Sequence, residues 1–212
     1  MGWIGELGGN QMSVLDITAR DTALEAARVG NARAFVGLLE PHRQTLWAVC
    51  LRITNEPRHA VDALAHGVGQ AWRTMADFPP DVPFGLWLSR ALATAARTVA
   101  WHQQRSAATS TGAMPAPTVA TDGGERLIQM RLEMLPVVVR EAIALRQLCG
   151  LTYEQIATHQ GIGVHTVKER LRRAVGLQAL DAGPRLDKVH FDQLLRSVFI
   201  RQLQEDQRKV SR

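Results

Sequence analysis

The chain has 212 residues, of which 46% are hydrophobic and 21% charged, and its formal net charge is +5. This length exceeds the roughly 100–150 residues of a common single domain and predicts two compact modules. The sequence has no apolar run near the ~18–20 residues that span a bilayer, no export signal at its start, and no cofactor, metal or nucleophile motif. We therefore expect a cytoplasmic, non-enzymatic protein without a cofactor, and the positive charge favours a polyanionic partner.

A first helical domain is predicted over 15–103, after an N-terminal extension over 1–14. Apolar residues recur at helical spacing in four segments of this domain: 15–29, 32–54, 57–78 and 84–103. Gly30 followed by Asn31 is typical of a helix end and a new N-cap. Pro41 predicts a bend or a split near the start of the second segment. These segments predict four successive helices.

Three further parts follow the first domain. Ser, Thr, Ala, Gly and Pro dominate residues 104–124, which predicts a flexible linker. Residues 125–182 form a second helical block, and residues 183–212 contain an amphipathic helix with a stripe of apolar side chains: Leu194, Leu195, Val198 and Phe199. The fold class is therefore all-α, with two helical domains joined by a linker. Because exposing this stripe is costly, we expect the last helix to dock on the first domain or on a partner protein. Docking that covers part of the second helical block would make the last helix autoinhibitory.

Residues 151–180 carry the pattern of a helix-turn-helix. Thr152 and Gln155 fit a capping box that starts the first helix, and Gly161 allows a tight turn. In the second helix the apolar residues share one third of the circumference, and the polar side carries His165, Thr166, Lys168, Glu169, Arg170, Arg172 and Arg173. A helix fits the major groove, where Arg and Glu can read base edges, so we expect these residues to bind double-stranded DNA. The alternative is a charged face that is only solvated.

Several short motifs mark the second helical block: Leu135-Pro136, Arg140-Glu141, Leu145-Arg146, Gly150-Leu151-Thr152-Tyr153, Ile156-Ala157, Thr166-Val167-Lys168, Arg170-Leu171 and Arg173-Ala174. With them, residues 135–180 closely resemble region four of the extracytoplasmic-function sigma factors. In that family this domain reads the upstream promoter element. The resemblance implies that promoter DNA is the partner and that Lys168, Glu169, Arg172 and Arg173 contact it.

The first domain resembles sigma region two more loosely, through Ala34-Phe35, Trp72, Phe78, Phe84 and Trp87-Leu88. The resemblance implies core RNA polymerase as a partner, gripped by an acidic helix, and opening of the downstream promoter element. The chain departs from the family at both sites. Of the acidic motif only Asp62 is present, with His59 and His66 at neighbouring positions, and Thr94 and Thr98 replace the usual Asn and Asp. Asp62 is therefore the expected polymerase contact.

Three functional hypotheses stay open. The first is an alternative sigma factor that directs RNA polymerase to promoters, which the two-domain organisation favours. The second is a sigma-like DNA-binding regulator that does not bind core polymerase productively, which the missing acidic residues favour. The third is an interaction protein that sequesters a partner. An anti-sigma or other regulatory protein is a further candidate partner.

Some residues allow a structural and a functional interpretation. His59, Asp62 and His66 share a helical face, but two imidazoles and one carboxylate leave a metal site short of ligands, so solvated side chains are favoured. Trp72 and Trp87 could stack on unpaired bases, yet both lie within apolar stripes, which favours core packing. The two cysteines, Cys50 and Cys149, are too isolated for a disulfide framework or a zinc site and are interpreted as small core residues.

Overall fold

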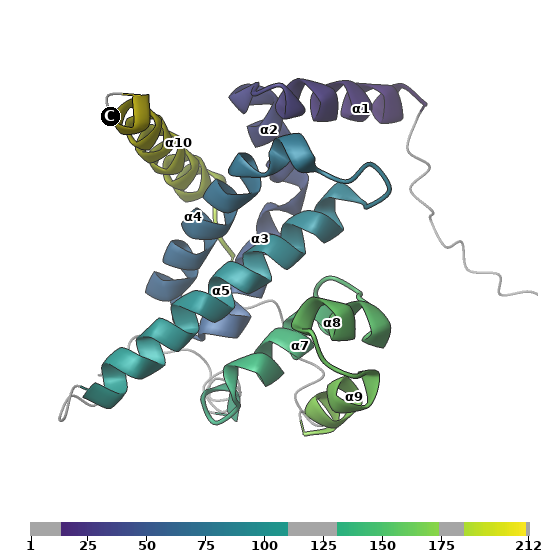
Figure 1. The fold of residues 1–212 in the computed structure, drawn as a ribbon, viewed down its shortest axis with the longest axis vertical. Coiled ribbons are helices and arrows are strands. Elements are labelled where there is room, and N and C mark those ends of the chain that lie inside the picture. The colour runs from purple at the N-terminus through teal and green to yellow at the C-terminus, as the bar shows by residue number, and fades with distance from the viewer. Residues whose placement is uncertain (1–13, 110–130, 174–184, 211–212) are drawn as a thin grey trace, which may run out of the picture.

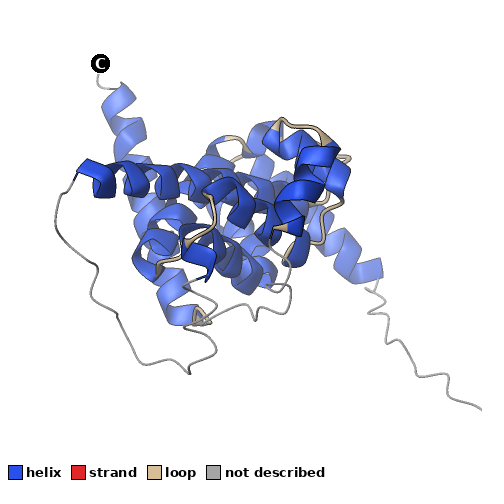
Figure 2. Cartoon of the chain, turned by 90° about the horizontal axis from the view of Figure 1, so that it is seen from below, coloured by secondary structure: helices blue, strands red, loops and turns tan. Residues whose placement is uncertain are grey.

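A computed structural model describes residues 14–109, 131–173 and 185–210 of the chain. Within these ranges the protein consists of helices and their connections and contains no strand, which confirms the all-α fold class (Figure 2). The helices are α1 (Val14–Arg28), α2 (Ala32–Leu39), η1 (Glu40–His42), α3 (Arg43–Thr54), α4 (Pro57–Arg73), η2 (Met75–Asp77), α5 (Phe84–Thr109), α7 (Val137–Gln147), α8 (Tyr153–Gln160), α9 (Val164–Arg172) and α10 (Lys188–Val210). No helix of the described ranges is long and apolar enough to cross a membrane.

Local signals set the boundaries of the first helices. Gly30 has a φ of +92°, a conformation that glycine adopts at little cost, and α1 ends just before it. The Asn31 side chain then accepts a hydrogen bond from the Ala34 amide at 3.1 Å and caps α2. Pro41 lies in the 3-10 turn η1, so the predicted split of the second segment into α2 and α3 is confirmed.

The core of the first domain lies between α3, α4 and α5 (Figure 1). Leu64, Leu88 and Leu92 are fully buried within it. Gly67 allows α4 to approach α5 closely, because a Cβ at this position would lie 3.1 Å from the Leu92 Cα. The helix α5 continues to Thr109, past the predicted helix end at residue 103. The predicted linker therefore overlaps α5, and its remainder lies outside the described residues, as does the N-terminal extension up to residue 13.

The predicted base-stacking candidates Trp72 and Trp87 belong to one connected cluster of aromatic rings, joined by the contact between Phe35 and Phe84. The Trp72 ring centroid lies 5.2 Å from that of Phe35 and 5.4 Å from that of Phe199, which belongs to α10. The ring of Trp87 packs against Phe78 at 5.2 Å and against the neighbouring Phe84 at 5.8 Å. Such tilted and edge-to-face pairs are typical of protein cores. Both tryptophans are partly buried and pack against the core, in agreement with the interpretation that the apolar spacing favoured.

The C-terminal helix α10 docks on the first domain beside α4 (Figure 1). Phe191 is fully buried and Leu195 is 2% exposed, and both join the core cluster of the domain. At the start of the segment, the Gln44 side chain donates a hydrogen bond to the Leu186 carbonyl at 2.7 Å and accepts one from its amide at 3.3 Å. Docking of the last helix was predicted either on the first domain or on a partner protein, and in the structure α10 docks on the first domain.

The second module packs directly on the first. Its helix α7 lies against α3 and α5, and its buried residues Val137, Leu145 and Ile156 belong to the same core cluster as the first domain.

Cys50 is fully buried in this cluster, whereas Cys149 is partly buried beside it. Both are free thiols, and burial raises the pKa of each. The interpretation as a small core residue is confirmed for Cys50, whereas Cys149 lies at the edge of the core.

Candidate DNA-recognition module

The helices α8 and α9 form a helix-turn-helix whose start and turn follow from local chemistry. The Thr152 hydroxyl accepts a hydrogen bond from the Gln155 amide at 3.2 Å, and the Gln155 side chain accepts one from the Thr152 amide at 2.9 Å. This is the predicted capping box. Gly161 ends α8 with a φ of +66°, and the Ile162 amide bonds back to the Ala157 carbonyl at 3.0 Å. The turn thus fixes where α9 begins.

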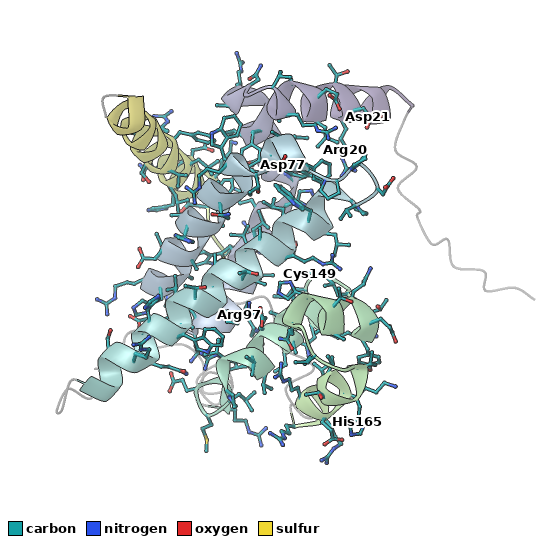
Figure 3. The ribbon with its side chains drawn as sticks, viewed as in Figure 1. Arg20, Asp21, Asp77, Arg97, Cys149 and His165 are labelled. Atoms are coloured by element: carbon teal, nitrogen blue, oxygen red, sulfur yellow. The ribbon has the colours of Figure 1, made fainter. Side chains whose placement is uncertain are left out.

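The inner side of α9 anchors the helix and leaves its outer side in solvent. Val167 is fully buried, and Val164 and Leu171 pack partly buried against the core. The exposed side chains of α9 and its C-cap are His165, Thr166, Lys168, Arg172 and Arg173. Figure 3 shows His165 at the outer edge of the module, on the side away from α5. Five of the seven predicted DNA contacts are therefore exposed, and the other two are partly buried.

Two of the predicted contacts form an ion pair on the surface. The Arg172 guanidinium lies 2.9 Å from the Glu169 carboxylate, one turn earlier on α9. Its hydrogen bond and positive charge hold the pKa of Glu169 below the usual range. Glu169 is thus ionised at neutral pH and can only accept hydrogen bonds, such as those from a cytosine amino group. Because surface ion pairs are weak, a DNA phosphate or base can compete for Arg172.

Lys168 lies beside the ring of Tyr153, at the N-terminus of α8. The Lys168 ammonium is 5.7 Å from the ring centroid, and the Arg146 guanidinium from α7 lies 4.8 Å from the same centroid. Cations are attracted to the negative face of an aromatic ring. Tyr153 thereby holds two cations near one edge of the module, and Lys168 remains exposed and can reach a phosphate.

Arg170, another predicted contact, is directed into the module. Its Nη1 donates a hydrogen bond to the Gln160 side-chain oxygen at 2.5 Å, and Arg170 is partly buried. Gln160 in turn donates to the Glu141 carboxylate at 2.8 Å and to the Val138 carbonyl at 3.0 Å. Sequence reasoning missed this connection. A signal existed, because Arg170 lies three residues after the buried Val167 and thus near the inner side of α9.

The exposed face of α4 carries the predicted polymerase contact. Asp62 and His66 are exposed, and the apolar Val61 between His59 and Asp62 is 41% exposed. The His59 ring nitrogen lies 2.8 Å from the Glu56 carboxylate, an acidic neighbour that the sequence comparison with region two did not include. Among the described residues, His, Cys, Asp and Glu form no group suited to hold a metal ion.

Known proteins resemble this chain in sequence over both modules. The sequence profile of the family described as "Sigma-70, region 4" matches residues 125–176. The RNA polymerase sigma-H factor of Pseudomonas aeruginosa is 27% identical over 168 residues, which cover 71% of this chain and 87% of that protein. The ECF RNA polymerase sigma factor SigK of Mycolicibacterium vanbaalenii is 28% identical over 173 residues, covering 76% of this chain and 86% of the relative.

Solved structures share the fold. CnrH, in complex with the cytosolic domain of CnrY, covers 76% of this chain with a TM-score of 0.52 and 24% identity, and 95% of its own chain is matched. The sigma factor RpoE of Bartonella quintana, in complex with the anti-sigma factor NepR, covers 68% of this chain with a TM-score of 0.51 and 24% identity, and 93% of its chain is matched. The profile match, the named relatives and the shared fold agree. Residues 125–176 match region 4 of the sigma-70 family, and the chain as a whole is similar to the extracytoplasmic-function sigma factors of RNA polymerase.

Proposed function

We propose that the chain is an alternative sigma factor that directs RNA polymerase to promoters, with the outer side of α9 reading the upstream element in the major groove. The observation that carries this proposal is the exposure of His165, Thr166, Lys168, Arg172 and Arg173 on one short helix segment. The capped α8 and the Gly161 turn hold that segment on a rigid support. The protein acts by binding, without catalysis or a cofactor, in the cytoplasm where polymerase and chromosome meet.

The roles of the seven residues differ in this proposal. Lys168 contacts a phosphate and positions the helix, whereas Arg173 and Arg172 are available to guanine edges and Glu169 to cytosine. His165 and Thr166 lie at the N-terminal end of α9, which enters the groove first in this class of motif. Arg170 supports the helix through Gln160, and a direct contact of Arg170 with DNA would require it to leave that partner.

The DNA interface is tested by single substitutions. A duplex is first selected from a random library with the parent protein, and its affinity is measured by fluorescence anisotropy. Arg173→Ala and Lys168→Ala should each weaken binding by about 1–3 kcal/mol, and the Lys168 variant should also reduce the salt dependence. Arg196→Ala removes an equally exposed charge from α10 and is the matched control. If both α9 variants bind the selected duplex as tightly as the parent does, the proposal that the outer side of α9 contacts DNA is wrong.

The polymerase contact is tested separately. We expect the chain to co-elute with core RNA polymerase in gel filtration, and Asp62→Lys to reduce that association because it reverses the charge on the exposed face of α4. The control Asp21→Lys makes the same charge change on α1. If the parent protein binds selected DNA but never co-elutes with polymerase, the chain is instead a sigma-like DNA-binding regulator, as the single remaining acid Asp62 would allow.

A regulatory protein is a further proposed partner. The solved relatives are complexes, one with the cytosolic domain of CnrY and one with the anti-sigma factor NepR. An anti-sigma protein of the same organism would be found by cross-linking the full chain in its native cells.

A further inference from the structure

One stripe of α4 is exposed at its start and covered further along. Asp62, His66 and Gly69 follow one another at spacings of four and three residues, so they lie on one side of the helix and form what we call the Asp62 stripe. Asp62 and His66 are exposed, whereas Gly69 is buried. Another element therefore covers the stripe at Gly69.

The element that covers Gly69 is α10. A Cβ on Gly69 would lie 3.5 Å from the Val198 Cγ1, and Val198 is itself buried. The next residue of α10, Phe199, places its ring edge-on to Trp72 of α4 at 5.4 Å between centroids, and to Phe35 of α2 at 6.3 Å. The C-terminal helix thus lies across the stripe that carries Asp62.

The two ends of this contact are held differently. At the start of α10, Phe191 is fully buried, and the nearby Leu186 backbone is held by both polar groups of the Gln44 side chain. At Gly69, the covering residues include Phe199, which is only partly buried. Parts of a fold with fewer buried contacts open at a lower free energy than the core. The part of α10 that covers the stripe can therefore detach while the core of the first domain stays folded.

The position of α10 relates it to partners of α4 and not to DNA. Figure 1 shows α10 on one side of the first domain and the helices α8 and α9 on the opposite side. The exposed residues of α9 are thus free of α10, and detaching it uncovers no further part of the recognition helix. It does uncover α4.

A protein that binds Asp62 needs more surface than the exposed start of α4 offers. The segment from Pro57 to His66 has ten residues, which as a helix is about 15 Å long and about 10 Å wide. A specific interface covers roughly 800 Å² on each partner, several times the area of that segment. A partner that contacts Asp62 must therefore extend well beyond it, and along α4 it meets α10.

We propose that α10 competes with core RNA polymerase for the Asp62 stripe of α4. While α10 covers Gly69, polymerase can use only the start of the stripe, and full binding requires that α10 moves away. The apparent affinity for polymerase is then reduced by the fraction of molecules in which α10 is detached. This inference rests on the proposed contact between polymerase and Asp62.

The test compares Phe199→Ala with the control Ile200→Ala. Phe199 contacts α4 through Trp72, whereas the neighbouring Ile200 is 56% exposed. The affinity of each full-length protein for core RNA polymerase is measured by biolayer interferometry. Phe199→Ala should bind about fivefold or more tightly than the parent, which corresponds to a rise of the detached fraction from about one tenth to about one half. Ile200→Ala should bind as the parent does.

A second variant loosens α10 from a site outside α4. Gln44→Ala removes the two hydrogen bonds to the Leu186 backbone and exposes no apolar surface of α10. Because each hydrogen bond contributes modestly, the affinity for polymerase should rise by about twofold to tenfold. If the parent, Phe199→Ala and Gln44→Ala all bind polymerase equally tightly, α10 does not compete and the proposal is overturned, although the proposed function stands.

Two further measurements locate the effect. Adding Asp62→Lys to Phe199→Ala should abolish the gain in polymerase affinity, and a gain that persists would place the contact elsewhere and overturn the proposal. The affinity of Phe199→Ala for the selected duplex should equal that of the parent, because α10 lies away from α9. Equal changes in both affinities would indicate a general perturbation and contradict the proposal. If no variant binds polymerase at all, the proposed function itself fails.

Hydrogen exchange shows directly whether polymerase displaces α10. In the parent saturated with core polymerase, amides of residues 194–200 should exchange at least about fivefold faster than in the free chain, while amides of α3 stay protected. Unchanged protection of residues 194–200 in the complex would mean that polymerase and α10 bind α4 together, and the proposal would be wrong.

Discussion

Replacing Phe191 by alanine tests how much α10 contributes to the stability of the first domain. Phe191 is fully buried within the shared core. A phenylalanine side chain buries ~150–250 Å², which at ~25 cal/mol per Å² corresponds to about 4–6 kcal/mol. The alanine methyl retains part of this area and the unfolded chain is already partly compact. We therefore expect the free energy of unfolding to fall by about 3–5 kcal/mol, as for similar core truncations.

The loss has an upper limit that depends on how α10 unfolds. If α10 detaches before the rest of the chain, the global free energy of unfolding falls only by the free energy of docking, and the remainder appears as local opening. Urea titration followed by circular dichroism measures the global change, and hydrogen exchange over residues 188–200 measures the local one. Truncation after residue 182 removes α10 and should lower solubility, because Phe199 no longer covers Trp72.

Val189→Ala is the matched control, because Val189 lies on the same helix and is 64% exposed. It should change the free energy of unfolding by no more than about 0.5 kcal/mol. If Phe191→Ala and Val189→Ala unfold at the same urea concentration and exchange at the same rate over α10, the docking of this helix contributes no stability and the reasoning is refuted.

Two further predictions concern local chemistry. Thr152→Ala removes the N-cap of α8 and should lower the free energy of unfolding by about 1 kcal/mol, measured by urea titration. The control Thr158→Ala, within the same helix, should not lower it by this amount. Equal losses in the two variants would contradict the capping role of Thr152. Burial, with a smaller contribution from the charge of Arg20, holds the pKa of His42 below its ordinary 6.5. Below pH 6.5 the unfolded chain therefore binds a proton that the folded chain does not, so the free energy of unfolding should decrease until the folded pKa is passed. His42→Gln should remove this component, and identical pH profiles of parent and variant would show that His42 does not contribute.

Features that depend on neighbours in the sequence could be predicted well. The capping box of Thr152 and Gln155, the turn at Gly161 and the split at Pro41 each require only a few consecutive residues. The end of α5 was placed too early because residues 104–109 are small and polar. Gln and Ala nevertheless favour helices, and α5 continues through them.

Features that depend on tertiary placement could not be predicted. Helical spacing identified the apolar stripe of α10, but two docking sites were compatible with it, and only the packing against α4 distinguishes them. The pairing of Arg97 with Glu141 joins residues 44 positions apart, and no local pattern indicates it. Its existence depends on how α7 packs on α5. The inward direction of Arg170 depends in the same way on the position of Gln160.

The contact between Arg170 and Gln160 has a consequence for efforts to retarget the protein to other promoters. A library that randomises the basic residues of α9 would naturally include Arg170 together with Arg172 and Arg173. Most members would then lose the hydrogen bond to Gln160. They would be scored as poor binders of every promoter sequence, whichever bases their exposed side chains could recognise. Keeping Arg170 constant and varying the exposed positions confines the search to sequences that still present the helix correctly.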